Sequence, residues 1–192
     1  LLFVGRLTKE KNIEFLIRAF RDIHHKMPDT VLVLTARGPL EQTLKELSEE
    51  LGVREEVIFT GALPFETLVH AYHSADLFVF SSMTETQGLV LLEAMACGLP
   101  VVAVRASGVQ DMVDHEVDGL LTECRVDEFS DAVLRVLSSR DTYERLKTNA
   151  YKKADQLSSA NMVKRLEALY LELRPRRQRR SRAHGEDVWN AF

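Results

Sequence analysis

The sequence predicts an α/β fold in which helices cover both faces of a doubly wound parallel sheet. Short, β-rich apolar runs alternate with segments of helical periodicity over most of the chain. Most of these runs lack the polar alternation of a half-exposed strand, as is typical of strands buried on both faces. Alternation of strands and helices predicts parallel strands joined by right-handed crossovers. The 192 residues suffice for one well-packed domain.

The elements are expected in a regular order along the chain. A helix with Asn12 as its N-cap should follow the first strand, because its apolar side chains fall on one face. Another helix should carry His70 and His73, and a further one should begin near residues 87–88. Only helices are expected after the last strand, over residues 126–137, 143–156 and 160–173. The expected strands are residues 1–4, 31–35, 57–60, 77–80, 101–104 and 120–122.

The segments that leave the strands are where ligands should bind. Doubly wound sheets, here of the Rossmann-like kind, bind their ligands at the carboxyl ends of the strands. The chain has neither the glycine fingerprint of a dinucleotide site nor that of a P-loop, which disfavours a dehydrogenase. The segments to inspect are therefore residues 5–11, 36–39, 61–64, 81–88 and 105–109.

Two cations follow the first expected strand. Arg6 and Lys11 stand in the loop that leads to the first helix. Cations beside a helix N-terminus form an anion site that suits phosphate. A solvated basic loop would have the same sequence, so the pattern alone leaves both interpretations open.

Two carboxylates raise a question in the stretch ETQGLVLLE, residues 85–93. Glu93 stands in the most apolar part of a predicted helix, where a buried charge requires hydrogen-bond donors. The hydroxyl groups of a sugar could supply them, and so could backbone amides or a lysine. Glu85 lies in a polar loop, where we expect water to solvate it. Gly88 would allow a ligand to approach the backbone closely.

Composition excludes several classes of protein. No run of eighteen apolar residues predicts a membrane span, and no signal peptide is recognisable. The two cysteines, Cys97 and Cys124, fit a reduced cytoplasmic protein with two buried thiols. The six histidines show no metal-ligand spacing, so we expect no metal site.

The charge is unevenly distributed. Residues 174–192 hold six basic against two acidic side chains, whereas residues 1–173 hold 19 against 27. We therefore expect a domain over residues 1–173 and a basic, flexible tail over residues 174–192. The tail could attract an anionic membrane surface or could simply be solvated, and we expect no nucleic acid partner.

Taken together, these pieces resemble the C-terminal domain of the family-4 retaining glycosyltransferases, which have the two-domain GT-B architecture. The resemblance is collinear from residue 3 to about residue 173. The segments that carry it are FVGRLTKEKN (3–12), GPLEQTLKEL (38–47), GALP (61–64), ADLFVFSS (75–82), ETQGLVLLE (85–93), EAMACGLPVVA (93–103) and DGLL (118–121).

The resemblance implies a role for each matching position. Arg6 and Lys11 match the pair that holds the diphosphate of a nucleotide-sugar donor. Glu93 matches the carboxylate that binds the ribose, and Glu85 the catalytic one near the donor sugar. The remaining implied contacts are the backbone of Gln87, Gly88 and Leu89 with phosphate or sugar, and the backbone near Leu63 and Pro64 with the base.

The chain departs from the family pattern at three turns. The family often has Glu-Gly-Phe-Gly at residues 85–88, Gly-x-Gly-Pro at residues 36–39 and Gly-Gly at residues 107–108, where this chain has ETQG, ARGP and SG. The form ETQGL resembles that of bacterial glycolipid synthases that glucosylate diacylglycerol. It points to a lipid acceptor.

The resemblance implies a hexosyltransferase that is retaining, metal-independent and free of cofactors, with a UDP-sugar or GDP-sugar as donor and a lipid or glycan as acceptor. Because Leu1 begins inside an expected strand, we expect a fragment that lacks an N-terminal acceptor domain and is inactive alone. The expected location is cytoplasmic, including the inner face of the membrane. A non-catalytic nucleotide-sugar-binding domain is the alternative, which an acceptor domain in the full-length sequence would exclude.

Overall fold

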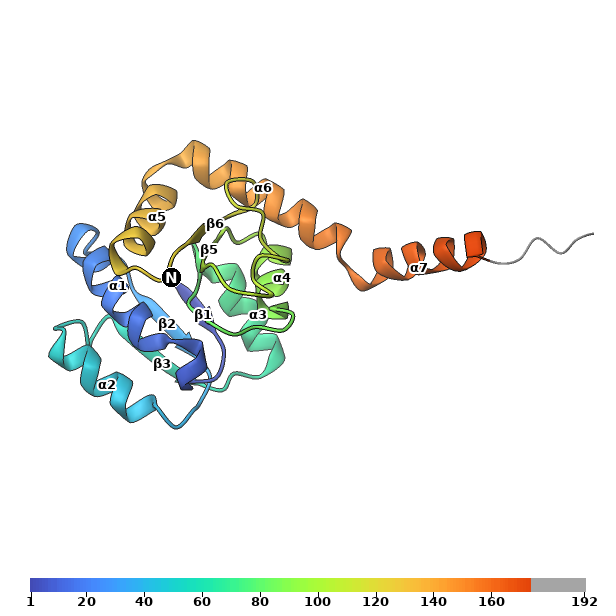
Figure 1. Cartoon of the computed structure of the whole chain (residues 1–192). Coiled ribbons are helices and arrows are strands. Elements are labelled where there is room, and N and C mark those ends of the chain that lie inside the picture. Colours follow the sequence, from blue (N-terminus) through green and yellow to red (C-terminus); the bar gives the residue numbers. More distant parts are fainter. Residues whose placement is uncertain (174–192) are drawn as a thin grey trace, which may run out of the picture. The chain divides into compact units, whose positions relative to one another are not determined.

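The predicted α/β fold is confirmed by the computed structural model, which describes residues 1–173. Six parallel strands form one sheet in the order β3-β2-β1-β4-β5-β6 (Figure 1). Both ends of each strand lie within one or two residues of their expected positions. The strands are β1 (Leu2–Val4), β2 (Leu32–Thr35), β3 (Val57–Gly61), β4 (Phe78–Phe80), β5 (Val101–Val104) and β6 (Gly119–Thr122).

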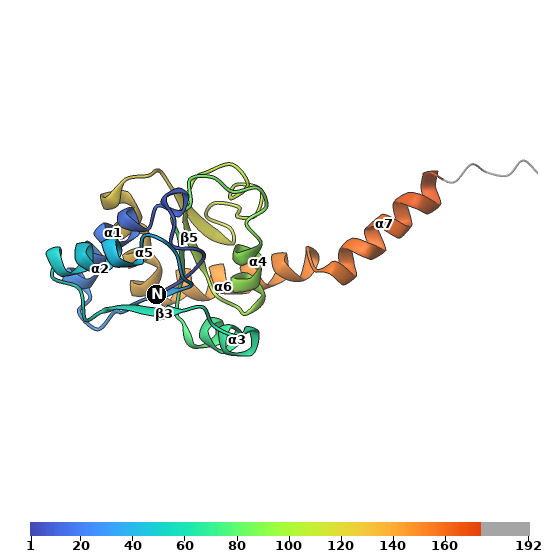
Figure 2. The same ribbon diagram turned by 90° about the horizontal axis from the view of Figure 1, so that it is seen from below.

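Helices cover both faces of the sheet. Helices α1, α2 and α5 lie on one face, and α3 and α4 lie on the other (Figures 1 and 2). Helix α6 contacts both α4 and α5. The helices are α1 (Ile13–Lys26), α2 (Glu41–Glu50), α3 (Phe65–Ser74), α4 (Leu89–Ala96), α5 (Val126–Ser138), α6 (Arg140–Gln156) and α7 (Ser159–Leu173), and a short 3-10 helix, η1 (Lys9–Lys11), precedes α1.

Two helix starts differ from their expected form. Asn12 does occupy the N-cap of α1, but its backbone is left-handed, with φ of 52°, and its side chain makes no capping hydrogen bond. The side-chain amide instead donates to Sγ of Cys124 at 3.3 Å. Helix α6 begins three residues earlier than expected because the hydroxyl of Ser139 accepts a hydrogen bond from the amide of Thr142 at 3.3 Å.

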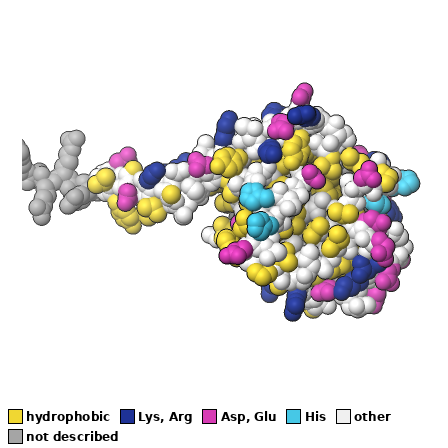
Figure 3. Space-filling view, turned by 180° about the vertical axis from the view of Figure 1, so that it is seen from behind, with side chains coloured by type: hydrophobic (Ala, Val, Ile, Leu, Met, Phe, Trp, Pro, Cys, Tyr) yellow, Lys and Arg dark blue, Asp and Glu magenta, His cyan; other side chains and the backbone are white. Residues whose placement is uncertain are grey.

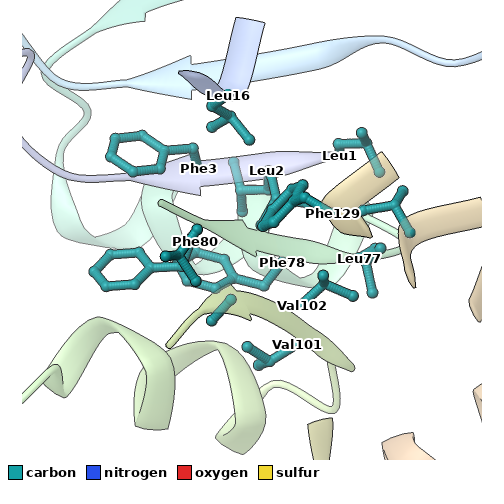
Figure 4. Packing of buried hydrophobic residues seen from close by; sticks show 14 of the residues in the cluster. Leu1, Leu2, Phe3, Leu16, Leu77, Phe78, Phe80, Val101, Val102 and Phe129 are labelled. Carbon is teal, nitrogen blue, oxygen red and sulfur yellow. The ribbon is translucent and has the colours of Figure 1, made fainter. Parts of the chain in front are cut away.

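Aromatic side chains form the centre of the core (Figure 4). The rings of Phe3 on β1 and Phe78 on β4 each lie 6.0 Å from that of Phe80, measured between centroids. Phe15 of α1 meets Phe129 of α5 edge to face at 5.4 Å. The first contacts join β1 to β4, and the second holds two helices together above the sheet.

The strand order reverses between β1 and β4. The chain leaves β1 toward α1 on one face, and it leaves β4 toward α4 on the other face (Figure 1). Leu2 pairs with Phe78 across this point. Because the two connections diverge, a crevice opens at the carboxyl ends of β1 and β4, where sheets of this class bind ligands.

The described chain divides into two units, Leu1–Ser158 and the segment that starts at Ser159. Within the second unit, α7 has no buried residue. The apolar side chains of Leu166, Leu169, Tyr170 and Leu173 are exposed, and Figure 3 shows hydrophobic side chains along α7. The tail over residues 174–192 lies outside the described residues, so the boundary after residue 173 stays a prediction.

No helix within residues 1–173 is long and apolar enough to cross a membrane. The expectation of two buried thiols was wrong, because Cys124 is exposed and Cys97 is half-buried.

Replacing Phe129 by alanine should destabilise the globular unit by about 3–5 kcal/mol, because it leaves a cavity between α1 and α5. Phe65 is the matched control, since its side chain is 79% exposed at the start of α3. Phe65→Ala should change the free energy of unfolding by less than about 0.5 kcal/mol. Urea unfolding followed by circular dichroism measures both values, and equal losses would contradict this packing.

Candidate functional site

The crevice between β1 and β4 brings Lys11 and Glu85 together. Lys11 ends η1 after β1, and Glu85 lies in the loop after β4, 74 residues further along the chain. Nζ of Lys11 and Oε1 of Glu85 form an ion pair, with side chains only 18% and 15% exposed. The expectation that water solvates Glu85 was therefore wrong. Nζ also lies 5.7 Å above the ring of Phe80, a further contact that favours the cation.

Hydrogen bonds fasten the two loops to each other. The hydroxyl of Ser81 donates to the carbonyl of Lys11 at 2.8 Å, and the amide of Met83 donates to the carbonyl of Glu10 at 3.1 Å. Ser81 and its neighbour Ser82 are fully buried. Sequence reasoning assigned these serines no role, although two polar residues directly after an apolar strand were a usable signal. These serines fix the distance between the loop after β1 and the loop after β4, and therefore the position of the ion pair.

A cavity of about 250 Å³ opens beside the ion pair. Gly88 borders it in the N-cap position of α4, with a left-handed φ of 58°. The first amides of a helix lack the usual partners within the helix. In α4 the amide of Leu91 donates to the carbonyl of Gly88 at 2.9 Å, so those of Leu89 and Val90 are the ones available to an anion. The cavity is lined by Val4, Gly5, Lys11, Glu85, Gln87, Gly88, Leu89 and Val90.

The structure thus gathers most of the residues assigned to the donor diphosphate, but not all of them. Lys11, Gln87, Gly88 and Leu89 share the cavity, together with Glu85. Arg6 does not line it. Its side chain is 76% exposed and lies 3.6 Å from the carboxylate of Glu10.

Glu93 is exposed, so the expectation of a buried carboxylate was wrong. Its neighbours Ala94 and Met95 turn toward the core, and Glu93 turns toward solvent. Its Oε2 accepts a hydrogen bond of 2.9 Å from the hydroxyl of Tyr72 on α3. Burial and then the charge of Glu93 raise the pKa of Tyr72 above its ordinary value, so this hydroxyl stays protonated.

The segment predicted to meet the base lies at the start of α3. Pro64 is the N-cap residue of this helix, and its carbonyl accepts a hydrogen bond from the amide of Leu68 at 2.9 Å. Leu63 is half-buried and Pro64 is exposed. Neither residue lines the cavity beside Lys11, and nor does Glu93. Some of the predicted residues therefore line one central cavity, and Leu63, Pro64 and Glu93 lie outside it.

A larger cavity of about 520 Å³ lies elsewhere, between α1 and α5. Four of its charged side chains already form two ion pairs, Arg21 with Asp22 at 2.6 Å and Lys26 with Asp131 at 3.1 Å. It borders the C-terminal half of α1, away from the carboxyl ends of the strands. Residues 1–173 contain no group of three or more side chains suited to a metal ion.

The loop after β5 braces the loop that carries Glu85. A Cβ atom on Gly108 would lie 2.3 Å from the carbonyl oxygen of Glu85, a distance that only glycine permits. Sequence reasoning marked residues 107–108 as a turn that could face a ligand. The geometry gives Gly108 a clear structural role as well.

Gly108→Ala should therefore displace residues 84–88 and destabilise the chain by more than the backbone effect alone. Gly52 is the matched control, because its φ of 71° is close to the 75° of Gly108 and a Cβ there meets no atom within 4 Å. Gly52→Ala should cost roughly 1–2 kcal/mol. Urea unfolding and hydrogen exchange of residues 84–90 measure the difference, and identical behaviour of the two variants would contradict the close contact.

Comparison with known proteins agrees with this geometry. The family model of the glycosyl transferases group 1 matches residues 1–153. An uncharacterized glycosyltransferase of Methanocaldococcus jannaschii is 40% identical over 153 residues, which are 79% of this chain and 39% of that protein. The alpha-monoglucosyldiacylglycerol synthase of Streptococcus pneumoniae is 33% identical over 173 residues, or 90% of this chain and 38% of that protein. The chain thus spans about two fifths of these relatives.

Solved structures share the fold. The Anabaena protein HepE in complex with UDP superposes with a TM-score of 0.78 and 25% identity, over 89% of this chain and 48% of that one. The C-terminal domain of a group 1 family protein from Francisella tularensis has a TM-score of 0.74 and 24% identity, over 81% of this chain and 84% of that one. The chain has the Rossmann-like fold of the C-terminal domain of GT-B glycosyltransferases, and it belongs to the glycosyl transferases group 1.

Proposed function

We propose that this chain is the donor-binding domain of a glycosyltransferase that transfers a hexose from a nucleotide sugar to an acceptor. The observation that carries this proposal is the Lys11–Glu85 pair beside the cavity at the start of α4. One cation and one carboxylate stand at the reversal of strand order, together with free helix amides. These groups suit a nucleoside diphosphate sugar, because it has an anionic part and a hydroxyl-rich part.

Lys11 and the first amides of α4 are the proposed diphosphate site. Lys11 supplies a full positive charge, and the backbone from Gln87 to Leu89 supplies hydrogen-bond donors. Gly88 has no side chain to keep the phosphates away from these amides. Arg6 is exposed and paired only at the surface, so it is free to turn toward a phosphate.

The same groups would stabilise the diphosphate as it leaves the sugar. Its growing negative charge would face Lys11 and the amino end of α4, where oriented donors favour an anion. Because the chain itself provides this stabilisation, we propose that transfer needs no metal ion. Glu85 would face the donor sugar, and the family resemblance assigns it to catalysis with retention of configuration.

The nucleoside would extend from the cavity toward α3. Glu93 would accept hydrogen bonds from the ribose hydroxyls, and the backbone near Leu63 and Pro64 would meet the base. UDP-sugars and GDP-sugars are the proposed donors. HepE was solved in complex with UDP, and a 36% identical relative from Mycolicibacterium smegmatis is a GDP-mannose-dependent mannosyltransferase.

The acceptor is proposed to be a lipid or a glycan, bound by an N-terminal domain in the rest of the protein. By name, one relative is a phosphatidylinositol monomannoside mannosyltransferase and another is an alpha-monoglucosyldiacylglycerol synthase. A lipid acceptor would place the enzyme in the cytoplasm at the inner face of the membrane.

Calorimetry on Glu85→Gln and Glu93→Gln tests the donor site. Each ligand is compared with and without its sugar, UDP with UDP-glucose and GDP with GDP-mannose. A lost charge-assisted hydrogen bond weakens affinity by about 10-fold to 150-fold. We expect Glu93→Gln to weaken all ribose-bearing ligands alike, whereas Glu85→Gln should weaken chiefly the sugar-bearing ones.

The control is Glu50→Gln, an exposed carboxylate on α2 that should have no effect. If the unaltered chain binds none of these ligands, the proposed function is wrong. If Glu85→Gln weakens a bare diphosphate as much as the sugar donor, the assignment of Glu85 to the sugar is wrong.

The arginine-rich residues 174–182 are proposed to attract an anionic membrane. Basic residues near such a surface contribute about 1 kcal/mol each, and this run holds six arginines. Truncation after residue 173 should abolish cosedimentation with phosphatidylglycerol vesicles, while neutral phosphatidylcholine vesicles should bind neither form. Equal cosedimentation of the full and truncated chains with the anionic vesicles would refute the role of the tail.

A further inference from the structure

We infer that Tyr72 is a positioning residue that holds the Glu93 carboxylate in the orientation required by the ribose of the donor. The inference rests on the proposed function and extends it to a side chain that neither the sequence motifs nor the cavity had identified. Tyr72 lies on α3, whereas Glu93 lies on α4, 21 residues further along the chain.

The tyrosine is itself held firmly. Its side chain is only 2% exposed, and its ring lies 5.9 Å from that of Phe78 on β4, tilted by 43°. A ring packed in this way has little freedom, so its hydroxyl occupies a defined point above the sheet. That point is 2.9 Å from Oε2 of Glu93.

An exposed glutamate needs such a contact if it is to act as a precise acceptor. The side chain of Glu93 faces solvent, and an unrestrained glutamate loses rotamer freedom when it binds a ligand. The hydrogen bond from Tyr72 fixes Oε2 before the ligand arrives. Oε1 then remains available to accept hydrogen bonds from adjacent hydroxyl groups, because a carboxylate offers about four acceptor positions.

The contact also connects the two proposed ends of the nucleoside site. Pro64 begins α3 next to the segment proposed for the base, and Tyr72 stands two turns later on the same helix. The Tyr72–Glu93 hydrogen bond therefore sets the position of the ribose carboxylate relative to the base segment. A positioning role predicts an effect only on ligands that carry the ribose hydroxyls.

The test compares Tyr72→Phe with the unaltered full chain by calorimetry. The phenylalanine keeps the packed ring and removes only the hydroxyl. The ligands are UDP or GDP, whichever binds more tightly, and its 2′,3′-dideoxy analogue, which keeps the base and the diphosphate. We expect Tyr72→Phe to weaken the natural nucleotide about fivefold, the loss typical of one side chain that must be ordered on binding, and to leave the dideoxy analogue unchanged.

Two further variants separate positioning from general damage. Combining Tyr72→Phe with Glu93→Gln should weaken the nucleotide no more than Glu93→Gln alone, because both act through one carboxylate. Tyr143→Phe is the matched control, since Tyr143 lines a different cavity together with Met27 and Thr30, and it should leave both ligands unaffected.

The outcomes distinguish the positioning role of Tyr72 from the donor site itself. Equal losses for the nucleotide and its dideoxy analogue, or no loss for either, overturn the positioning role while the donor site stands. Failure of the unaltered chain to bind any nucleoside diphosphate overturns the proposed function and the positioning role together.

Discussion

The reversal of strand order between β1 and β4 is the constraint on which the site depends. Every strand is parallel, so all carboxyl ends meet at one edge, and at this reversal the connections from β1 and β4 leave toward opposite faces. The buried aromatic rings of Phe3, Phe78 and Phe80 hold the two strands in place. Above them, the buried serines and the close approach of Gly108 fasten three loops together. The rigidly packed rings in the sheet thus give the loops at the carboxyl ends of the strands precise positions.

The Lys11–Glu85 pair also determines the electrostatics of the cavity. Removing either charge would leave the other largely buried without its partner, which is strongly unfavourable. With both present, the unliganded cavity is nearly neutral at this point. A diphosphate that approaches Lys11 would add negative charge beside Glu85. The ammonium group has three donors, so it can serve a phosphate oxygen and Glu85 at once, and the sugar hydroxyls can share the carboxylate.

The sequence predicted the fold well because the relevant signal is local. Apolar runs and helical periodicity located all six strands, and the family resemblance of residues 3–12 and 85–93 assigned Lys11, Glu85 and Gly88 to one donor site. Burial was predicted in the wrong sense for the two glutamates. Glu93 stands in an apolar sequence, yet helix geometry turns it outward, and Glu85 stands in a polar sequence, yet the loop after β1 covers it. Such contacts join residues far apart in the chain, as does the hydrogen bond of Tyr72, so local pattern could not reveal them.

The central claim is that the cavity beside Lys11, and no other, receives a nucleotide sugar. The most direct measurement is a titration of the isotopically labelled full chain with UDP-glucose and GDP-mannose, followed through its backbone amide resonances. The account predicts that the largest shifts occur at Gly5, Lys11 and Gln87–Leu89, with smaller ones at Leu63 and Glu93. Shifts concentrated instead around Arg21, Lys26 and Asp131, which border the larger cavity between α1 and α5, would contradict it.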